Sequence, residues 1–171
     1  GASGWVGEAL IQELRDADPA IEILAVVPPQ PKHALEAGRL EKLQTLYGVE
    51  VLEADLRALS PVQFQESFQQ VFHLAAHTAT ECPGEEMRTN DEGTRALVSA
   101  LGSRLKGTPV LYTGSIASLD DFQSGARGVS EQVAPRPLTS YGQSKLAGEQ
   151  ILQEAAIRLG FRLHIVRAAN V

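Results

Sequence analysis

Cysteine, excess positive charge and long hydrophobic runs are all scarce in this sequence. Its 171 residues include one cysteine, Cys82, which rules out an internal disulfide and favours a reducing compartment. The net charge is −6 with both signs interspersed, so nothing favours a nucleic-acid or anionic-membrane partner. The longest wholly apolar run, residues 23–27, is far shorter than the roughly 20 residues that span a bilayer. We therefore expect a cytoplasmic protein with no nucleic-acid or membrane partner.

What the sequence does contain is typical of a globular domain. Hydrophobic residues make up 43% and charged residues 21%, and the length suffices for one domain with a sizeable core. Short apolar runs alternate with stretches of helical spacing, which predicts an α/β fold with a doubly wound parallel sheet. The predicted strands are 21–27, 49–53, 71–76, 109–112 and 161–167, and the predicted later helices are 34–47, 61–68, 85–105 and 141–159.

Three glycines, Gly1, Gly4 and Gly7, open the chain and lead into the first helix. Apolar residues at helical spacing begin at Val6, and Glu8 lies in the first turn, where the helix dipole favours an acid. Such a turn can bind a phosphate, because bare backbone N–H groups and the positive helix end face the anion. The same spacing fits a simple tight turn, so by itself it leaves both interpretations open.

Polar residues follow four of the predicted strands at their carboxyl ends. They are Asp55, His77 with Thr78, Ser115 and Asn170. Ligands of doubly wound sheets bind at this edge, so these positions together with the glycine turn indicate a dinucleotide-binding enzyme domain. Asp55 by itself is either a turn acid or a ligand contact.

Two polar residues lie inside predicted elements. His73, within an apolar run, is predicted to be a hydrogen-bonded core histidine rather than a catalyst. Asn90 either ties its helix to a neighbouring strand or is exposed, because a buried asparagine must be hydrogen-bonded.

The position after the predicted strand 21–27 leaves the choice between NAD and NADP open. A dinucleotide fold often places an acid there for the adenosine ribose, whereas this chain has Val27 and Pro28. Lys32 or His33 could instead meet a 2′-phosphate.

Tyr141 and Lys145 are four residues apart on a predicted helix and therefore lie on one face. A neighbouring ammonium should lower the pKa of the Tyr141 phenol and suit it to exchange protons with an alcohol or ketone. The alternative is an ordinary surface pair, and the other motifs of the chain favour the chemical interpretation.

The chain resembles the extended short-chain dehydrogenase/reductases, the NAD-dependent epimerase/dehydratase group, over its whole length. The motifs that carry the resemblance are G-A-S-G-W-V-G at 1–7, A-D-L at 54–56, V-F-H-L-A-A at 71–76, N-D-E-G-T at 90–94, T-G-S at 113–115, R-P-L-T-S-Y-G-Q-S-K at 136–145 and R-A-A-N-V at 167–171. It implies a Rossmann fold that binds NAD or NADP and acts on a small molecule, and we expect no metal site. A homodimer is a further expectation.

The resemblance also implies roles for individual residues. The implied cofactor contacts are Gly1, Gly4, Trp5, Val6 and Gly7 around the pyrophosphate, Asp55 and Leu56 at the adenine, Leu74, Ala75 and Ala76 along the adenosine and pyrophosphate, and Tyr141 and Lys145 near the nicotinamide ribose. The implied catalytic residues are Ser115, Tyr141 and Lys145. Ser115 and Asn170 would lie close to the substrate, and His77 and Thr78 are expected there from their position in the chain. Asn90 resembles the family's structural helix asparagine.

Three departures from the family pattern stand out. A first strand would precede residue 1, and a smaller substrate domain would follow residue 171, so we expect residues 1–171 to be an incomplete NAD(P)-binding Rossmann domain of a longer chain. The family often has a Tyr-Gly pair shortly after the catalytic serine, whereas Ser115 is followed by the segment Ile116–Asp120.

Three functions are compatible with these features. The leading hypothesis is a nucleotide-sugar epimerase or dehydratase that works by transient hydride transfer to bound NAD. The second is an NADP-dependent reductase or dehydrogenase of a hydroxysteroid-, flavonol- or thioester-like substrate. The third is a catalytically inactive nucleotide-binding protein on the same fold.

Overall fold

The fold consists of two parallel β-sheets with helices on both sides. The computed structural model describes residues 1–31, 34–78, 84, 88–119 and 130–169. Strand β1 (Leu24–Val27) pairs with β2 (Glu50–Glu53), while β3 (Val71–His73), β4 (Pro109–Ser115) and β5 (Arg162–Ala168) form a second sheet in that order. Every pairing is parallel, which confirms the predicted α/β fold with parallel strands.

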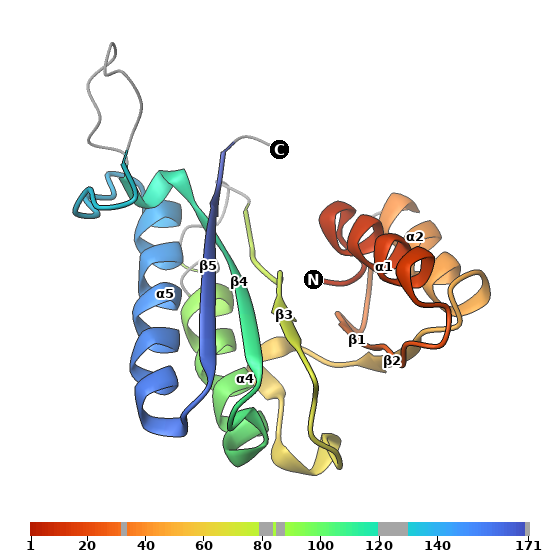
Figure 1. The fold of residues 1–171 in the computed structure, drawn as a ribbon. Coiled ribbons are helices and arrows are strands. Elements are labelled where there is room, and N and C mark those ends of the chain that lie inside the picture. The colour runs from red at the N-terminus through yellow and green to blue at the C-terminus, as the bar shows by residue number, and fades with distance from the viewer. Residues whose placement is uncertain (32–33, 79–83, 85–87, 120–129, 170–171) are drawn as a thin grey trace.

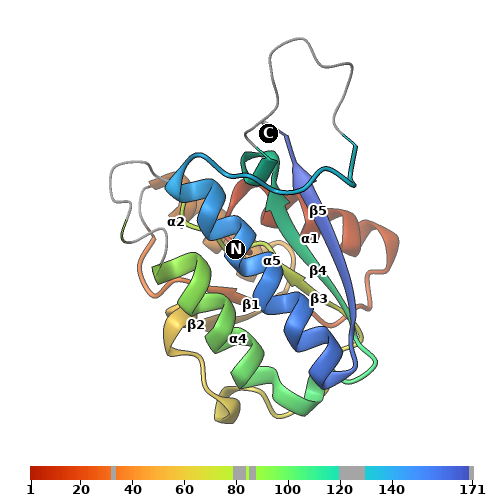
Figure 2. The same cartoon turned by 90° about the vertical axis from the view of Figure 1, so that its left-hand side faces the viewer.

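The helices form layers on the two sides of these strands. They are α1 (Trp5–Ala17), α2 (Ala34–Thr45), α4 (Gly93–Leu101) and α5 (Ser140–Leu159). Helices α4 and α5 cover one face of the three-stranded sheet, while α1 and α2 lie beyond the strands, next to β1 and β2 (Figure 1). Figure 2 shows α4 and α5 side by side across the sheet. Across the described ranges, each helix is too short or too polar to span a lipid bilayer.

Each sheet has its own apolar core. The larger core lies under α4 and α5 and includes Val98, Leu101, Val110, Tyr112, Leu152 and Phe161. The smaller core, between α1, α2 and the two-stranded sheet, contains Ile11, Ala25, Val27, Leu43 and Val49.

Helix α5, which carries the Tyr141 motif, has defined signals at both ends. The Thr139 hydroxyl accepts a hydrogen bond from the Gly142 amide at 3.0 Å and caps the first turn. At the other end Gly160 takes a left-handed conformation with φ of 74°, as the sequence predicts for a glycine after a helix.

Three predicted elements differ most from the observed ones. The helix expected over 85–105 is, where described, a π-helix (Arg88–Glu92) that runs into α4 and then a 3₁₀ turn (Gly102–Leu105). The helix expected over 61–68 is one 3₁₀ turn (Pro61–Gln63), and the strand expected over 71–76 stops at His73. Tertiary hydrogen bonds, described below, hold the backbone beyond His73 in place of the sheet.

Candidate active site

The glycine turn lies between the two sheets, at the carboxyl ends of β1 and β3. The Gly1 nitrogen donates to the Val26 carbonyl at 3.4 Å. On its other side, a Cβ atom on Gly1 would lie 2.5 Å from the backbone of Leu74 and Ala75. A side chain at residue 1 would therefore force this segment away from β3, so only glycine fits here. The N-terminus is accordingly seen between β3 and α1 in Figure 1.

The start of α1 presents bare backbone. Gly4 is the N-cap and offers no side chain to accept hydrogen bonds from the first turn. A Cβ atom on Gly7 would overlap the Gly1 carbonyl oxygen, which keeps the turn close to the helix. Trp5 and Val6, in the first turn of this helix, are 68% and 46% exposed. Uncapped N–H groups at the positive end of a 13-residue helix fit the pyrophosphate of a dinucleotide.

Asp55 and Leu56 follow β2. The Asp55 carboxylate caps the next 3₁₀ turn (Leu56–Ala58) by accepting from the Arg57 amide at 2.9 Å. It also pairs with the Arg57 guanidinium at 2.7 Å, and this hydrogen bonding lowers the pKa of Asp55. The Leu56 side chain packs against Gly93, where a Cβ atom would lie 2.7 Å from it. Asp55 is thus the turn acid of the sequence analysis, and its contact with adenine stays a prediction.

The backbone after β3 is held by one buried asparagine. Leu74, Ala75 and Ala76 are half-buried. The His77 amide donates to Asn90 Oδ1 at 2.8 Å, and the His77 carbonyl accepts from Asn90 Nδ2 at 3.1 Å. Of the two interpretations of Asn90, the structure therefore supports a tie between helix and strand end.

The ring of His77 lies half-buried at the same edge. Its Nδ1 atom is buried and has no hydrogen-bond partner among the residues that the structure describes. A buried nitrogen without a partner is uncommon and is consistent with the predicted ligand contact at His77. Thr78 next to it is exposed.

The same asparagine also reaches the Tyr141 helix. Asn90 Nδ2 donates to the Ser144 hydroxyl at 2.9 Å, and that hydroxyl donates to the Tyr141 carbonyl at 2.7 Å. A short π-helix, common at functional sites, carries Asn90. Sequence reasoning missed Ser144, although its position three residues after Tyr141 allows this bond to the preceding turn.

Lys145 lies below Tyr141 on α5 and is 2% exposed. Its Nζ atom lies 4.5 Å from the centroid of the Tyr112 ring, and the Tyr112 hydroxyl donates to the Lys145 carbonyl at 3.3 Å. Burial lowers the pKa of Lys145 to about 8, against an opposing effect of Glu149. Burial also raises the pKa of Tyr112, so this phenol stays neutral.

Ser115 ends β4 beside the first turn of α5. Its hydroxyl accepts from the Ala117 amide at 3.1 Å, at the start of a 3₁₀ turn (Ile116–Leu119). A Cβ atom on Gly142 would overlap the Ala117 carbonyl oxygen, which shows how closely α5 approaches this turn. Ser115 and Tyr141 therefore come from directly adjacent segments.

His73 is a core residue, as predicted. It is 3% exposed, and its Nε2 atom lies 2.8 Å from the Thr94 hydroxyl. Because that hydroxyl donates to the Asn90 carbonyl at 2.6 Å, Nε2 of His73 must be the donor in their contact. Burial, together with the charge of Lys145, lowers the pKa of His73 to about 3, so the ring is neutral.

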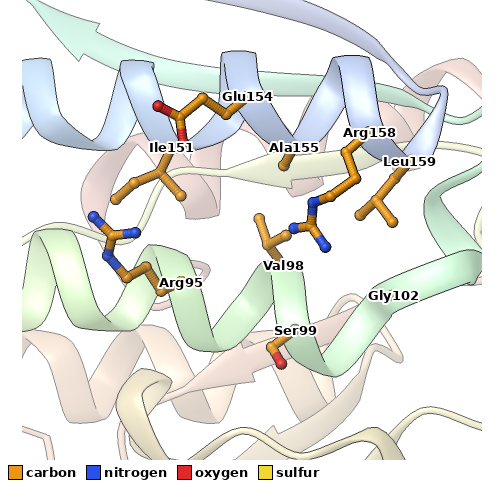
Figure 3. A pocket seen from close by; sticks show the side chains of 9 residues that line it. All are labelled: Arg95, Val98, Ser99, Gly102, Ile151, Glu154, Ala155, Arg158 and Leu159. Atoms are coloured by element: carbon orange, nitrogen blue, oxygen red, sulfur yellow. The ribbon is translucent and has the colours of Figure 1, made fainter.

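Some predicted residues and one hollow stand apart from this arrangement. Asn170, Lys32 and His33 lie outside the described residues. A hollow of about 410 Å³ between α4 and α5 is lined by Arg95, Glu154, Arg158 and neighbouring apolar residues (Figure 3). The α5 residues of this hollow begin at Ile151, ten positions after Tyr141 along the helix, so the hollow is separate from the candidate site.

Comparison with known proteins gives the family and the fold. Residues 1–171 match the family described as NAD dependent epimerase/dehydratase family. UDP-glucuronic acid 4-epimerase from Bacillus cereus, solved with NAD, matches in fold with a TM-score of 0.82 and 24% identity, over 99% of this chain and 55% of that one. MoeE5, solved with UDP-glucose and NAD, has a TM-score of 0.71 and 28% identity, over 96% of this chain and 50% of that one.

One curated relative is named as a reductase, whereas the Bacillus cereus structure is that of an epimerase. GDP-6-deoxy-D-mannose reductase of Pseudomonas aeruginosa is 31% identical over 58% of this chain and 34% of its own length. The chain thus spans about half of the solved relatives and about a third of this reductase. With the family match over its whole length and parallel sheets like those of the solved structures, this chain belongs to the NAD dependent epimerase/dehydratase family.

Proposed function

We propose that the protein is a nucleotide-sugar epimerase or dehydratase in which Tyr141 exchanges protons with a sugar hydroxyl. The observation that carries this proposal is the position of Tyr141. It lies one helical turn from the buried Lys145 and beside the segment that carries Ser115. MoeE5, at 28% identity, is a relative solved with UDP-glucose and NAD, which supports this substrate class.

The cofactor would be held mainly by backbone. Gly1, Gly4 and Gly7 would face its pyrophosphate, and the half-buried Ala75 and Ala76 would line its adenosine side. Lys145 would bind the nicotinamide ribose. When bound, the nicotinamide supplies the acceptor and later the donor of a hydride.

The side chains would supply proton transfer and orientation. The Tyr141 phenolate takes the proton from the sugar hydroxyl as that carbon is oxidised, and returns it when the carbonyl is reduced. Ser115 donates a hydrogen bond to the same oxygen, which stabilises the charge that develops there. Lys145 favours the ionised form of Tyr141 through its own positive charge.

A second candidate is a net NADP-dependent reductase. The absence of an acid at Val27-Pro28 favours it, because that acid usually binds the ribose of NAD. The Pseudomonas GDP-6-deoxy-D-mannose reductase, a relative at 31% identity, is named as a reductase. A catalytically inactive nucleotide-binding protein is disfavoured by the presence of Ser115, Tyr141 and Lys145 together.

The experiment that separates these functions uses the full-length protein, purified without added cofactor and then denatured. Mass spectrometry of the released nucleotide should find NAD, because an epimerase or dehydratase recycles its cofactor in place. The native protein, incubated with UDP- and GDP-hexoses without added cofactor, should then convert one of them. An empty protein that binds NADPH reversibly and consumes it would instead establish the reductase. The same preparation gives the oligomeric state, for which we expect a homodimer.

A further inference from the structure

A buried ion pair lies one turn beyond Lys145 on the same helix. Glu149 is 1% exposed, and both of its carboxylate oxygens accept from Arg167 of β5. The Arg167 Nε atom lies 3.0 and 3.2 Å from the two oxygens, and Nη2 lies 2.7 Å from the second. Burial of a carboxylate without a partner costs desolvation free energy, and a bidentate contact with a guanidinium offsets this cost.

The sheet leaves room for this carboxylate. Gly114 of β4 pairs in register with Arg167, and a Cβ atom on Gly114 would lie 2.6 Å from the Glu149 Oε1 atom. The carboxylate therefore packs directly against the strand position before Ser115. Its location is fixed by the helix, by Arg167 and by the absence of a side chain at residue 114.

Lys145 forms no ion pair among the described residues. The groups that face it from the packed elements are the neutral Tyr112 of β4 and the neutral His73 of β3, with Tyr141 and Glu149 on its own helix. Arg167 of β5 forms its ion pair with Glu149. Glu149 lies four residues after Lys145, on the same face of α5, and both side chains are buried, so within this described surrounding its carboxylate opposes the loss of the Lys145 charge.

We propose that Glu149 is a positioning residue that keeps Lys145 protonated and that Arg167 holds it in place for this purpose. Without the Glu149 charge, the Lys145 ammonium would still be buried, and the Arg167 guanidinium would have lost its partner and would repel it. Both effects favour the neutral amine. The role assigned here to Lys145 in catalysis rests on the proposed function, whereas the coupling of the three charges does not.

The test measures the protonation of Lys145 directly in the full-length protein. Competitive labelling with acetic anhydride at a series of pH values, read by mass spectrometry of the Lys145 peptide, gives the midpoint at which the amine loses its proton. Glu149→Gln should lower this midpoint by about one pH unit, a tenfold change in the protonation equilibrium. Glu154→Gln, an exposed acid on the same helix, is the matched control and should leave it unchanged.

The double variant Glu149→Gln/Arg167→Gln covers the case in which the single variant does not fold, because it removes both charges of the ion pair and leaves neither partner alone. The midpoint of the double variant should lie between those of the wild type and Glu149→Gln. If Glu149→Gln does not fold, the midpoint of the double variant should still lie below that of the wild type. A midpoint equal to that of the wild type in the variants that fold would overturn the proposal and leave the pair a purely structural tie.

Activity measured over the same pH range separates this proposal from the proposed function. The alkaline fall in turnover should move to lower pH together with the labelling midpoint. A shifted midpoint with an unshifted activity profile would uphold the coupling of charges and count against a catalytic role for Lys145.

Discussion

The two regions of the molecule present different kinds of groups to the candidate site. The N-terminal region, residues 1–53, contributes a glycine turn whose groups are backbone amides. The C-terminal region, residues 71–169, contributes side chains. Among the described residues the buried polar side chains are Ser3 in the first region and His73, Asn90, Thr94, Thr108, Ser118, Ser144, Lys145 and Glu149 in the second.

The difference follows from what each region has to bind. A phosphate is bound by amides that the chain geometry itself orients, so the first region needs close backbone approach and little else. Proton transfer requires side chains in fixed rotamers, and these are held by other buried polar groups in the second region. We therefore expect substitutions in the first region to act through steric overlap, and those in the second through lost hydrogen bonds.

The largest effect on stability is expected for Asn90→Ala. The change removes the partner of the His77 amide, the His77 carbonyl and the Ser144 hydroxyl. Several unsatisfied groups should lower the free energy of unfolding by about 3 kcal/mol, measured by urea denaturation. Glu92→Ala, which breaks an exposed pair with Arg88 at 3.8 Å, should cost less than about 0.5 kcal/mol. Equal losses in the two variants would show that the asparagine network has no special role.

Gly7→Ala tests the close approach in the N-terminal region. The new Cβ atom would overlap the Gly1 carbonyl, so we expect a loss of about 2 kcal/mol in stability and roughly tenfold weaker cofactor binding by calorimetry. Gly38→Ala is the control, because α2 leaves open space at that position and the change should stabilise the protein by about 0.5 kcal/mol. Unchanged cofactor binding in Gly7→Ala would argue against the phosphate site.

His73 makes stability depend on pH in the C-terminal region. Its pKa falls from 6.5 to about 3 on folding, so the unfolded chain binds a proton below pH 6.5 that the folded chain does not. Stability should therefore fall as the pH drops below that value, by about 1 kcal/mol between about pH 7 and pH 5.5. His73→Gln should remove this part of the pH dependence in urea denaturation. An identical slope in the variant would mean that other groups cause it.

Asp55→Asn should have the smallest effect. The hydrogen bond from Arg57 lowers the pKa of Asp55, so the pair stabilises the fold above about pH 3.8 and this contribution is lost as the pH falls through the folded value. Because the Asp55 side chain is 42% exposed, solvent screening limits the loss at neutral pH to about 0.5 kcal/mol. The difference between variant and wild type should shrink as the pH falls below about 3.8, and a constant difference would point to packing instead.

The features that the sequence predicts are local in character. Apolar runs predict the strands, the Tyr141 and Lys145 spacing predicts a shared helix face, and the apolar setting of His73 predicts a core histidine. The contacts of Asn90 with Ser144 and of Glu149 with Arg167 could not be predicted in this way. They join residues 54 and 18 positions apart and depend on how the helices pack and on the register of β4 with β5.

The positions at which helices and strands end could not be predicted from the sequence either, because tertiary contacts determine them. The backbone after His73 leaves the sheet, and the Asn90 side chain takes over the hydrogen bonds of His77. The helix around Asn90 adopts a π-turn where it makes these contacts. Neither effect has a signal in the residues near it along the chain.

The most direct test of the division between the two regions is Tyr141→Phe in the full-length protein, with cofactor affinity and turnover measured side by side. The variant keeps the packing of the ring and loses the proton donor, so turnover should fall by roughly 100-fold or more while the cofactor Kd stays within about twofold. Tyr47→Phe, a tyrosine of the N-terminal region that lies 3.5 Å from Gln12, should change neither quantity. Loss of cofactor affinity in parallel with turnover, or turnover that survives the change, would contradict the account.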